Sequence, residues 1–258
     1  MHTFQEIIRK FESFLEQEVR FPSSPALLYD PCRYILKAGG KRIRPALCLM
    51  AAELFGGLGS AVFHTAAAFE LFHNFTLIHD DIMDQAPLRR GRKTVHEEYG
   101  MATGILSGDV MNIFAYQALT KVDAASLPQI LQLFNQTAIE VCEGQQLDMD
   151  YEKMDAISVD AYLQMIRLKT SVLLAACLQS GAILSGANLQ DQQLIYEFGI
   201  NLGLAFQLQD DYLDTFGKNE QTGKQIGGDI LAGKKTILWV QALQYADADT
   251  KAAFMQTA

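Results

Sequence analysis

Apolar residues recur every three or four positions along most of the chain, which is the spacing of an α-helix with a buried face. The first such segment covers residues 4–15, with Ile7, Ile8 and Phe11 among its apolar positions. The same period returns at 43–55, 60–84, 103–120, 128–147, 158–184, 189–215 and 234–246. No run of alternating β-branched residues stands out. The pattern predicts an all-α fold, a bundle of roughly ten or more helices whose long members place side chains in a central cavity.

Proline and glycine punctuate this pattern. We expect all the prolines to mark connections or first turns of helices, because a proline inside a helix removes a hydrogen bond. They are Pro22, Pro25, Pro31, Pro45, Pro87 and Pro128. Glycines cluster between the periodic segments, as turns require. No linker is evident, so we expect a single domain over residues 1–258.

Composition narrows the class of protein. The 258 residues include 21 Lys+Arg and 30 Asp+Glu, a net charge of −9, which argues against a nucleic-acid binder. The longest apolar segment, 172–187, is too short to span a membrane and carries Gln179, so no span is expected. The cysteines are widely spaced and form no C-x-x-C pair, which favours a reducing, cytoplasmic location. They are Cys32, Cys48, Cys142 and Cys177.

Two D-D-x-x-D clusters carry the first candidate chemistry. Each ends a long apolar helical segment, and its carboxylates lie within about a 100° arc of one helix face. Like charges so placed repel one another, so we expect a cation to neutralise them, and Mg²⁺ accepts such oxygen ligands. A single cluster could equally be a solvated helix end, but two at matching positions favour metal-diphosphate binding. The candidate metal ligands are Asp80, Asp81, Asp84, Asp210, Asp211 and Asp214.

Cationic residues gather beside these clusters although the protein is acidic. One group follows the first cluster, a second lies in a Gly-Gly-Lys-Arg segment, and a third is in the carboxyl half. Either of the first two runs alone would more often be a solvated surface, but together they could hold a polyanion. The groups are Arg89, Arg90, Arg92 and Lys93; Lys41, Arg42 and Arg44; and Lys169, Lys224 and Lys234. No G-x-x-x-x-G-K-[ST] loop is present, so the diphosphate is expected to be a leaving group.

The motifs that contain these residues occur in a fixed order over nearly the whole chain. They are GGKRIRP at 39–45, LIHDDIMDQAPLRRGRKTVH at 77–96, GQ at 144–145, KT at 169–170, and FQLQDDYLDTFG at 206–217 followed by TGKQIGGDILAGKKT at 222–236. In this the sequence resembles the trans-isoprenyl diphosphate synthase family, also called polyprenyl synthetases. The resemblance implies an isoprenoid synthase-like helical fold around a deep cavity, usually in a homodimer. It also implies coupling of an allylic diphosphate to isopentenyl diphosphate with loss of pyrophosphate.

The resemblance assigns roles residue by residue. It implies that both aspartate clusters bind Mg²⁺, with about three ions per site when substrate is bound. The positions matching the isopentenyl diphosphate site are Gly40, Lys41, Arg44, His73 and Arg90. Those matching the allylic diphosphate site are Arg89, Lys169, Thr170, Gln207, Lys224 and Lys234. The residues expected to be catalytic are Asp80, Asp84, Asp210 and Lys169.

Other functions remain to be compared. Glu70 and His73 form an E-x-x-H, the spacing of di-iron bundles, but a second such pair is absent, so that interpretation fails. His73 could also be a core histidine without function. A terpene cyclase-like enzyme would not need GGKRIRP, a non-catalytic subunit would be expected to have lost carboxylates, and a structural bundle would need no second D-D-x-x-D.

Product length is expected to depend on the residues just before Asp80. Phe75 lies roughly 7.5 Å deeper along the helix and could form the cavity floor. Resemblance then implies a product of fifteen or twenty carbons, and the small Thr76 tilts the expectation to twenty. Phe72 could close the tunnel instead, and a phenylalanine on an apolar face is more often plain core. Because family members commonly extend further, we also expect that a carboxyl-terminal helical portion is missing.

Overall fold

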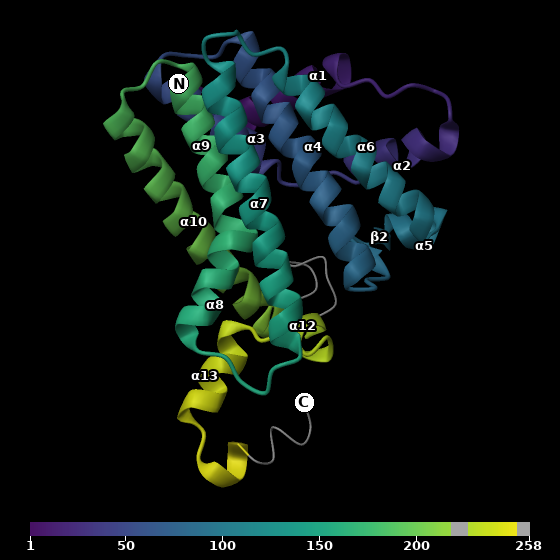
Figure 1. Cartoon of the computed structure of the whole chain (residues 1–258), viewed down its shortest axis with the longest axis vertical. Helices are drawn as coiled ribbons and strands as arrows, with labels where there is room; N and C mark the ends of the chain where they lie inside the picture. Colours follow the sequence, from purple (N-terminus) through teal and green to yellow (C-terminus); the bar gives the residue numbers. More distant parts are fainter. Residues whose placement is uncertain (218–226, 252–258) are drawn as a thin grey trace. The chain divides into compact units, whose positions relative to one another are not determined.

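The computed structural model describes residues 1–217 and 227–251. In these ranges it contains twelve α-helices, one π-helical turn and a two-residue antiparallel ribbon (Figure 1). The α-helices are α1 (Phe4–Glu18), α2 (Ala26–Lys37), α3 (Ile43–Phe55), α4 (Ser60–Met83), α5 (Val95–Tyr99), α6 (Met101–Leu119), α7 (Leu127–Glu152), α8 (Val159–Ile166), α9 (Val172–Leu184), α10 (Leu189–Phe216), α12 (Gly228–Leu231) and α13 (Ile237–Tyr245). The π-turn η1 is Arg167–Ser171, and strands β1 (Leu88–Arg89) and β2 (Arg92–Lys93) form the ribbon. The predicted all-α fold is confirmed.

The periodic segments coincide with the long helices. Segment 158–184 becomes the run α8, η1 and α9, and the other segments match α1, α3, α4, α6, α7, α10 and α13. Helices α2, α5 and α12 were not predicted. The expectation for Pro31 was wrong, because it lies inside α2 and is buried. Proline has no N–H, so the helix loses the backbone hydrogen bond to the carbonyl of Leu27, which lies in the exposed first turn. The packing of α2 on α6 compensates for this lost hydrogen bond.

The chain forms two compact units. The first comprises Met1–Thr137 and Leu173–Gly199, and the second comprises Ala138–Val172 and Ile200–Ala258. The assignment of one domain over 1–258 and the deep central cavity stay predictions.

Helix α4 organises the first unit. It packs against α3 and α6 and also contacts α1 and α5. Small residues at Ala66, Ala67 and Ala68 are completely buried and allow this close approach, and Phe69 and Phe72 fill the adjoining core. Each such phenylalanine contributes about 2–3 kcal/mol by leaving water. Because α4 is fixed along its length, its last turn holds the first aspartate cluster in a defined place.

The second unit has its own core. Tyr162, Met165 and Ile166 of α8 pack with Val240 of α13, and partly buried residues of α7 and α10 surround them. Helix α8 continues directly into η1. The core therefore fixes the start of the segment that carries Lys169 and Thr170.

Among the residues that the structure describes, one helical stretch is apolar enough to be compared with a membrane span. Val159–Leu184 has a mean hydropathy of 1.3 over its best window, but 72% of that window is buried inside the protein. A core helix of a folded unit has the same composition, so this stretch is weak support for a span.

Candidate active site

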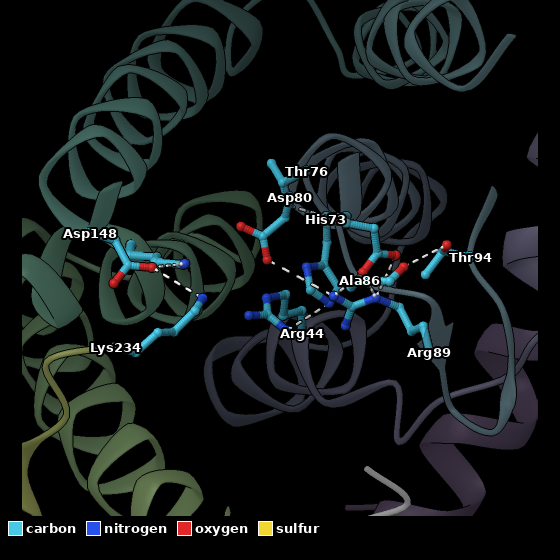
Figure 2. Close-up of polar contacts among 11 residues, drawn as sticks. Arg44, His73, Thr76, Asp80, Ala86, Arg89, Thr94, Asp148 and Lys234 are labelled. Carbon is cyan, nitrogen blue, oxygen red and sulfur yellow. Dashed lines mark hydrogen bonds and ion pairs between the residues drawn. The ribbon is translucent and has the colours of Figure 1, made fainter. Parts of the chain in front are cut away.

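The first aspartate cluster lies at the carboxyl end of α4, where the chain turns back into β1. Asp84 caps the helix, and Gln85 adopts a left-handed conformation with φ of 50°. The returning strand carries Arg89 to the cluster. Its Nε lies 2.9 and 2.8 Å from the two carboxylate oxygens of Asp81, and its terminal nitrogen lies 2.7 Å from Oδ1. The same terminal nitrogen is 3.9 Å from Asp80 (Figure 2).

This pair divides the cluster into unlike members. The side chain of Asp81 is 2% exposed, and burial raises its pKa although Arg89 opposes the change. Burial would lower the pKa of Arg89, but the Asp81 hydrogen bonds and the surrounding carboxylates outweigh it, so that pKa rises. Asp80 and Asp84 are less buried than Asp81. The Asp81 carboxylate is therefore held by a buried protein partner, and Asp80 and Asp84 stand one helical turn apart on the same face.

The GGKRIRP segment forms the approach to α3. Gly40 has φ of 147°, and a Cβ there would lie 2.9 Å from the guanidinium nitrogens of Arg90. Arg90 donates a hydrogen bond to the carbonyl of Gly39. Lys41 is exposed. Glycine at position 40 thus leaves room for the arginine to lie across the loop.

Arg42 and Arg44 have different environments although they are close in sequence. Arg42 is buried and donates to Glu12 and Glu70, both at 2.6 Å, and to the carbonyl of Leu36 at 2.8 Å. It therefore holds the loop against α1 and α4. Arg44 instead approaches His73 of α4, with 3.0 Å between its terminal nitrogen and Nε2 (Figure 2).

The Arg44–His73 pair is electrostatically unusual. Burial lowers the pKa of Arg44, and burial together with the nearby arginines lowers the pKa of His73 well below its usual range. His73 is thus neutral at pH 7 and accepts a hydrogen bond from Arg44. Arg44 Nε is buried without a hydrogen-bond partner. A guanidinium whose buried Nε donor is unused suits an anionic ligand.

The second aspartate cluster belongs to the other unit, at the carboxyl end of α10. Asp211 is 3% exposed and accepts hydrogen bonds from Tyr162 Oη at 2.6 Å, Gln207 Nε2 at 3.0 Å and the backbone N–H of Ile237 at 3.1 Å. Burial raises its pKa, with these donors opposing. Gln207 in turn accepts from Thr170 Oγ1 at 3.0 Å. Asp211, like Asp81, is engaged by the protein.

A carboxylate that sequence reasoning missed lies on α7. Asp148 Oδ2 is 2.5 Å from Lys169 Nζ and 3.5 Å from Lys234 Nζ (Figure 2). Burial would raise the pKa of Asp148, but the two ammonium groups outweigh it and lower that pKa. The signal was available, since Asp148 follows the quoted Gly144-Gln145 motif by three residues. The lysines are therefore gathered at one buried anion.

The predicted residues thus fall into two groups, one in each unit. The first unit brings together Arg89 with Asp81 and Arg44 with His73, and the second brings together Thr170 with Gln207 and Lys169 with Lys234. Asp214 is buried and accepts from the backbone N–H of Asp229 at 3.1 Å. Lys224 lies outside the described residues. Within residues 1–217 and 227–251, no three His, Cys, Asp or Glu side chains converge as a closed metal site.

Missed residues also include Asn74 and Tyr162, which have no motif of their own, and Glu70, which the sequence singled out only for its E-x-x-H spacing with His73. Glu70 accepts from Asn74 Nδ2 at 3.2 Å and from Arg42. Tyr162 is buried, with 1% of its surface exposed. Their roles depend on which helices meet, which periodicity does not state.

Comparison with known proteins decides the family. The polyprenyl synthetase family model matches residues 25–258. The chain belongs to the polyprenyl synthetase family. The geranylgeranyl diphosphate synthase of Methanosarcina mazei is 42% identical over 222 residues, which cover 85% of this chain and 68% of the relative.

Solved structures of related enzymes agree. A crystal structure of geranylgeranyl pyrophosphate synthase matches with a TM-score of 0.93 and 49% sequence identity. The match covers 100% of this chain and 77% of the chain in that structure. The geranylgeranyl pyrophosphate synthetase of Pyrococcus horikoshii matches with a TM-score of 0.90 and 34% identity. That match covers 98% of this chain and 79% of the chain in that structure. The expected isoprenoid synthase-like fold and trans-prenyltransferase class are confirmed.

Proposed function

We propose that this polyprenyl synthetase couples an allylic diphosphate head-to-tail to isopentenyl diphosphate, releasing pyrophosphate and forming a short-chain all-trans prenyl diphosphate. The observation that carries the proposal is the repeated arrangement of aspartates and cations. In each unit an aspartate cluster ends a long helix, and in each unit partly buried cations stand within hydrogen-bonding distance of an acidic or neutral partner. Relatives named geranylgeranyl diphosphate synthase support the short product.

The aspartates of the two clusters are the proposed magnesium ligands. Asp80 and Asp84, with Asp81 beside them, and Asp210, with Asp211 and Asp214, would hold Mg²⁺, because this ion takes one or two carboxylates and completes its shell with water and phosphate oxygens. Asp81 and Asp211 also accept hydrogen bonds from Arg89 and Tyr162. When bound, Mg²⁺ supplies charge stabilisation to a departing pyrophosphate, and about three ions per site are proposed.

Isopentenyl diphosphate is proposed to bind at Arg44 and His73, with Lys41 and Arg90 beside them. The unused Nε donor of Arg44 and the rigid guanidinium fork suit a diphosphate. A neutral His73 can accept from Arg44 and orient it without adding a repelling charge. Gly40 leaves the space that Arg90 occupies.

The allylic diphosphate is proposed to bind at Lys169, Thr170, Gln207 and Lys234. Asp148 holds the two ammonium groups at one place before substrate arrives, so less ordering is needed on binding. Thr170 and Gln207 offer a hydroxyl and an amide to the same ligand. The resemblance adds Arg89 and Lys224 to this set, and Lys169 is proposed to act directly on the leaving group.

The chemistry follows from these charges. Breaking the allylic carbon–oxygen bond leaves a carbocation and pyrophosphate, and the cationic side chains stabilise the anion as it departs. Apolar side chains keep water from the carbocation. The double bond of isopentenyl diphosphate then forms the new carbon–carbon bond, and the released pyrophosphate takes the proton that is lost.

Product length is proposed to depend on an aromatic stack behind the first cluster. Phe75 contacts Phe72, with ring centroids 5.6 Å apart, and Phe72 contacts Phe134 of α7 at 5.3 Å. Phe75 is half-buried whereas Phe72 and Phe134 are fully buried, so Phe75 is the member that a growing chain would meet first. We expect twenty carbons. A Phe75→Ala variant should give longer alcohols after dephosphorylation, and unchanged products would exclude Phe75 from this role.

A homodimer is proposed from the exposed face of α6. Met101, Ile105, Leu106 and Ile113 are 57%, 41%, 58% and 64% exposed, and Tyr116 continues the patch. A second copy would bury these exposed apolar side chains. Ile113→Lys should shift the protein to monomer in sedimentation analysis, whereas an unchanged mass would contradict this face as the interface.

One experiment tests the function directly. Purified protein is incubated with Mg²⁺, isopentenyl diphosphate and each of several allylic diphosphates, and pyrophosphate release is followed with product sizing. Asp80→Ala and Asp210→Ala should slow turnover by orders of magnitude. A cyclised product would indicate a cyclase, and activity only with an added partner would indicate a subunit. The absence of both turnover and Mg²⁺-dependent stabilisation by pyrophosphate would leave a structural bundle.

A further inference from the structure

The run from α8 to α9 widens into the π-turn η1 at the point where it carries Lys169 and Thr170. The backbone N–H of Val172 donates to the carbonyl of Arg167, five residues back. Lys169 and Thr170 are adjacent in sequence but contact different helices. Lys169 binds Asp148 on α7, and Thr170 donates to Gln207 on α10. A π-turn inside an α-helix frequently marks a functional position.

Two glycines face this turn from the helices that hold those partners. A Cβ on Gly144 of α7 would lie 2.2 Å from the backbone nitrogen of Lys169. A Cβ on Gly203 of α10 would lie 2.4 Å from Cα of Ser171. Contacts below 3.0 Å are essentially never made by a real Cβ. The backbones of α7 and α10 therefore touch the π-turn directly, with no side chain between them.

Each glycine stands one helical turn before a polar partner of the π-turn. Asp148 follows Gly144 by four residues and Gln207 follows Gly203 by four, so each pair shares a helix face. The side chains of Asp148 and Thr170 are short. The backbone contact brings them to within 2.5 and 3.0 Å of their partners. An alanine at position 203 would move the helices apart by at least about 0.6 Å to restore a 3.0 Å contact.

We propose that Gly203, together with Gly144, is a positioning residue that sets the reach of Lys169 and Thr170 toward the allylic diphosphate. The proposal rests on the function proposed above. It assigns to the two glycines a role in substrate affinity at one of two substrate sites, which is distinct from a general contribution to helix packing.

The chain supplies a matched control on the same helix. Gly199 lies one turn before Gly203, and a Cβ there would also meet a backbone Cα at 2.4 Å, that of Ala175 in α9. Gly199→Ala thus introduces the same clash away from the π-turn. Alanine favours the helical conformation more than glycine does at both sites. Any loss of stability or substrate affinity in a variant must therefore come from the new Cβ contact.

Steady-state kinetics with both substrates tests the proposal. Gly203→Ala should raise KM for the allylic diphosphate roughly 10- to 100-fold, because a displacement of this order misplaces the diphosphate ligands. KM for isopentenyl diphosphate should stay within about twofold. Gly199→Ala should lower the melting temperature comparably and leave both KM values at wild-type levels. If Gly203→Ala does not accumulate as folded protein, Ser171→Gly/Gly203→Ala replaces it, because this removes the Ser171 Cβ and Oγ contacts, and the same direction of change is expected.

The outcomes separate the two proposals. Wild-type protein that forms no prenyl product refutes the proposed function and this inference with it. Active wild-type protein with wild-type KM values in the position 203 variant overturns the inference alone. A rise in both KM values, or the same rise in Gly199→Ala, also overturns it, since general loosening of the helices would then explain the effect.

Discussion

The buried pair between Arg89 and Asp81 gives the most direct test of how the first cluster is built. Replacing Arg89 with alanine leaves the Asp81 carboxylate, 2% exposed, without the donors now 2.7–2.9 Å away. Breaking a buried ion pair from one side costs about 3–5 kcal/mol. Because the Arg89 side chain is 23% exposed, water can partly replace it, so we expect about 3 kcal/mol of lost unfolding free energy.

Urea denaturation followed by far-ultraviolet circular dichroism and tryptophan fluorescence measures this loss. The matched control is Asp30→Ala, which breaks the Arg33–Asp30 pair of the same 2.7 Å length but 32% and 49% exposed, and should cost less than about 1 kcal/mol. The double variant Arg89→Ala/Asp81→Asn should recover part of the stability, because it removes the stranded charge. A loss below 1 kcal/mol in Arg89→Ala, or no recovery in the double variant, would refute the reasoning.

Three further predictions concern other parts of the two sites. Asp80→Asn should abolish the Mg²⁺-dependent thermal stabilisation by pyrophosphate, whereas Asp81→Asn should retain it, and equal loss in both would contradict their division of roles. Tyr162→Phe should cost about 1.5–3 kcal/mol in urea denaturation, since it deletes a hydrogen bond to a buried carboxylate, and an unchanged midpoint would count against that bond. For His73 the folded pKa lies below the ordinary 6.5, so the unfolded chain takes up the proton first and stability is lost as pH falls below 6.5, by up to about 1.4 kcal/mol per pH unit. His73→Gln should flatten that part of the stability profile measured between pH 7.5 and 5, and an identical slope would disprove the assignment.

The success and failure of sequence reasoning have a common physical cause. The long helices could be predicted because their apolar period is repeated over several turns within one segment. Helix α2 could not, since Pro31 argues against it locally and packing on α6 and α5 compensates. Likewise the arginines of GGKRIRP look equivalent in sequence, yet Arg42 is buried against Glu12 and Glu70 while Arg44 faces His73.

By itself the sequence determined the helical class, the family and the set of residue types that carry the chemistry, because helical period and motif order are properties of neighbouring positions. Tertiary structure alone brought Arg89 to Asp81, Tyr162 to Asp211 and two lysines to Asp148, and placed a π-turn against Gly144 and Gly203. These outcomes depend on distances between helices that are far apart in sequence. A carboxylate becomes a ligand or an anchor according to which donor the fold brings within 3 Å, and no local pattern encodes that distance.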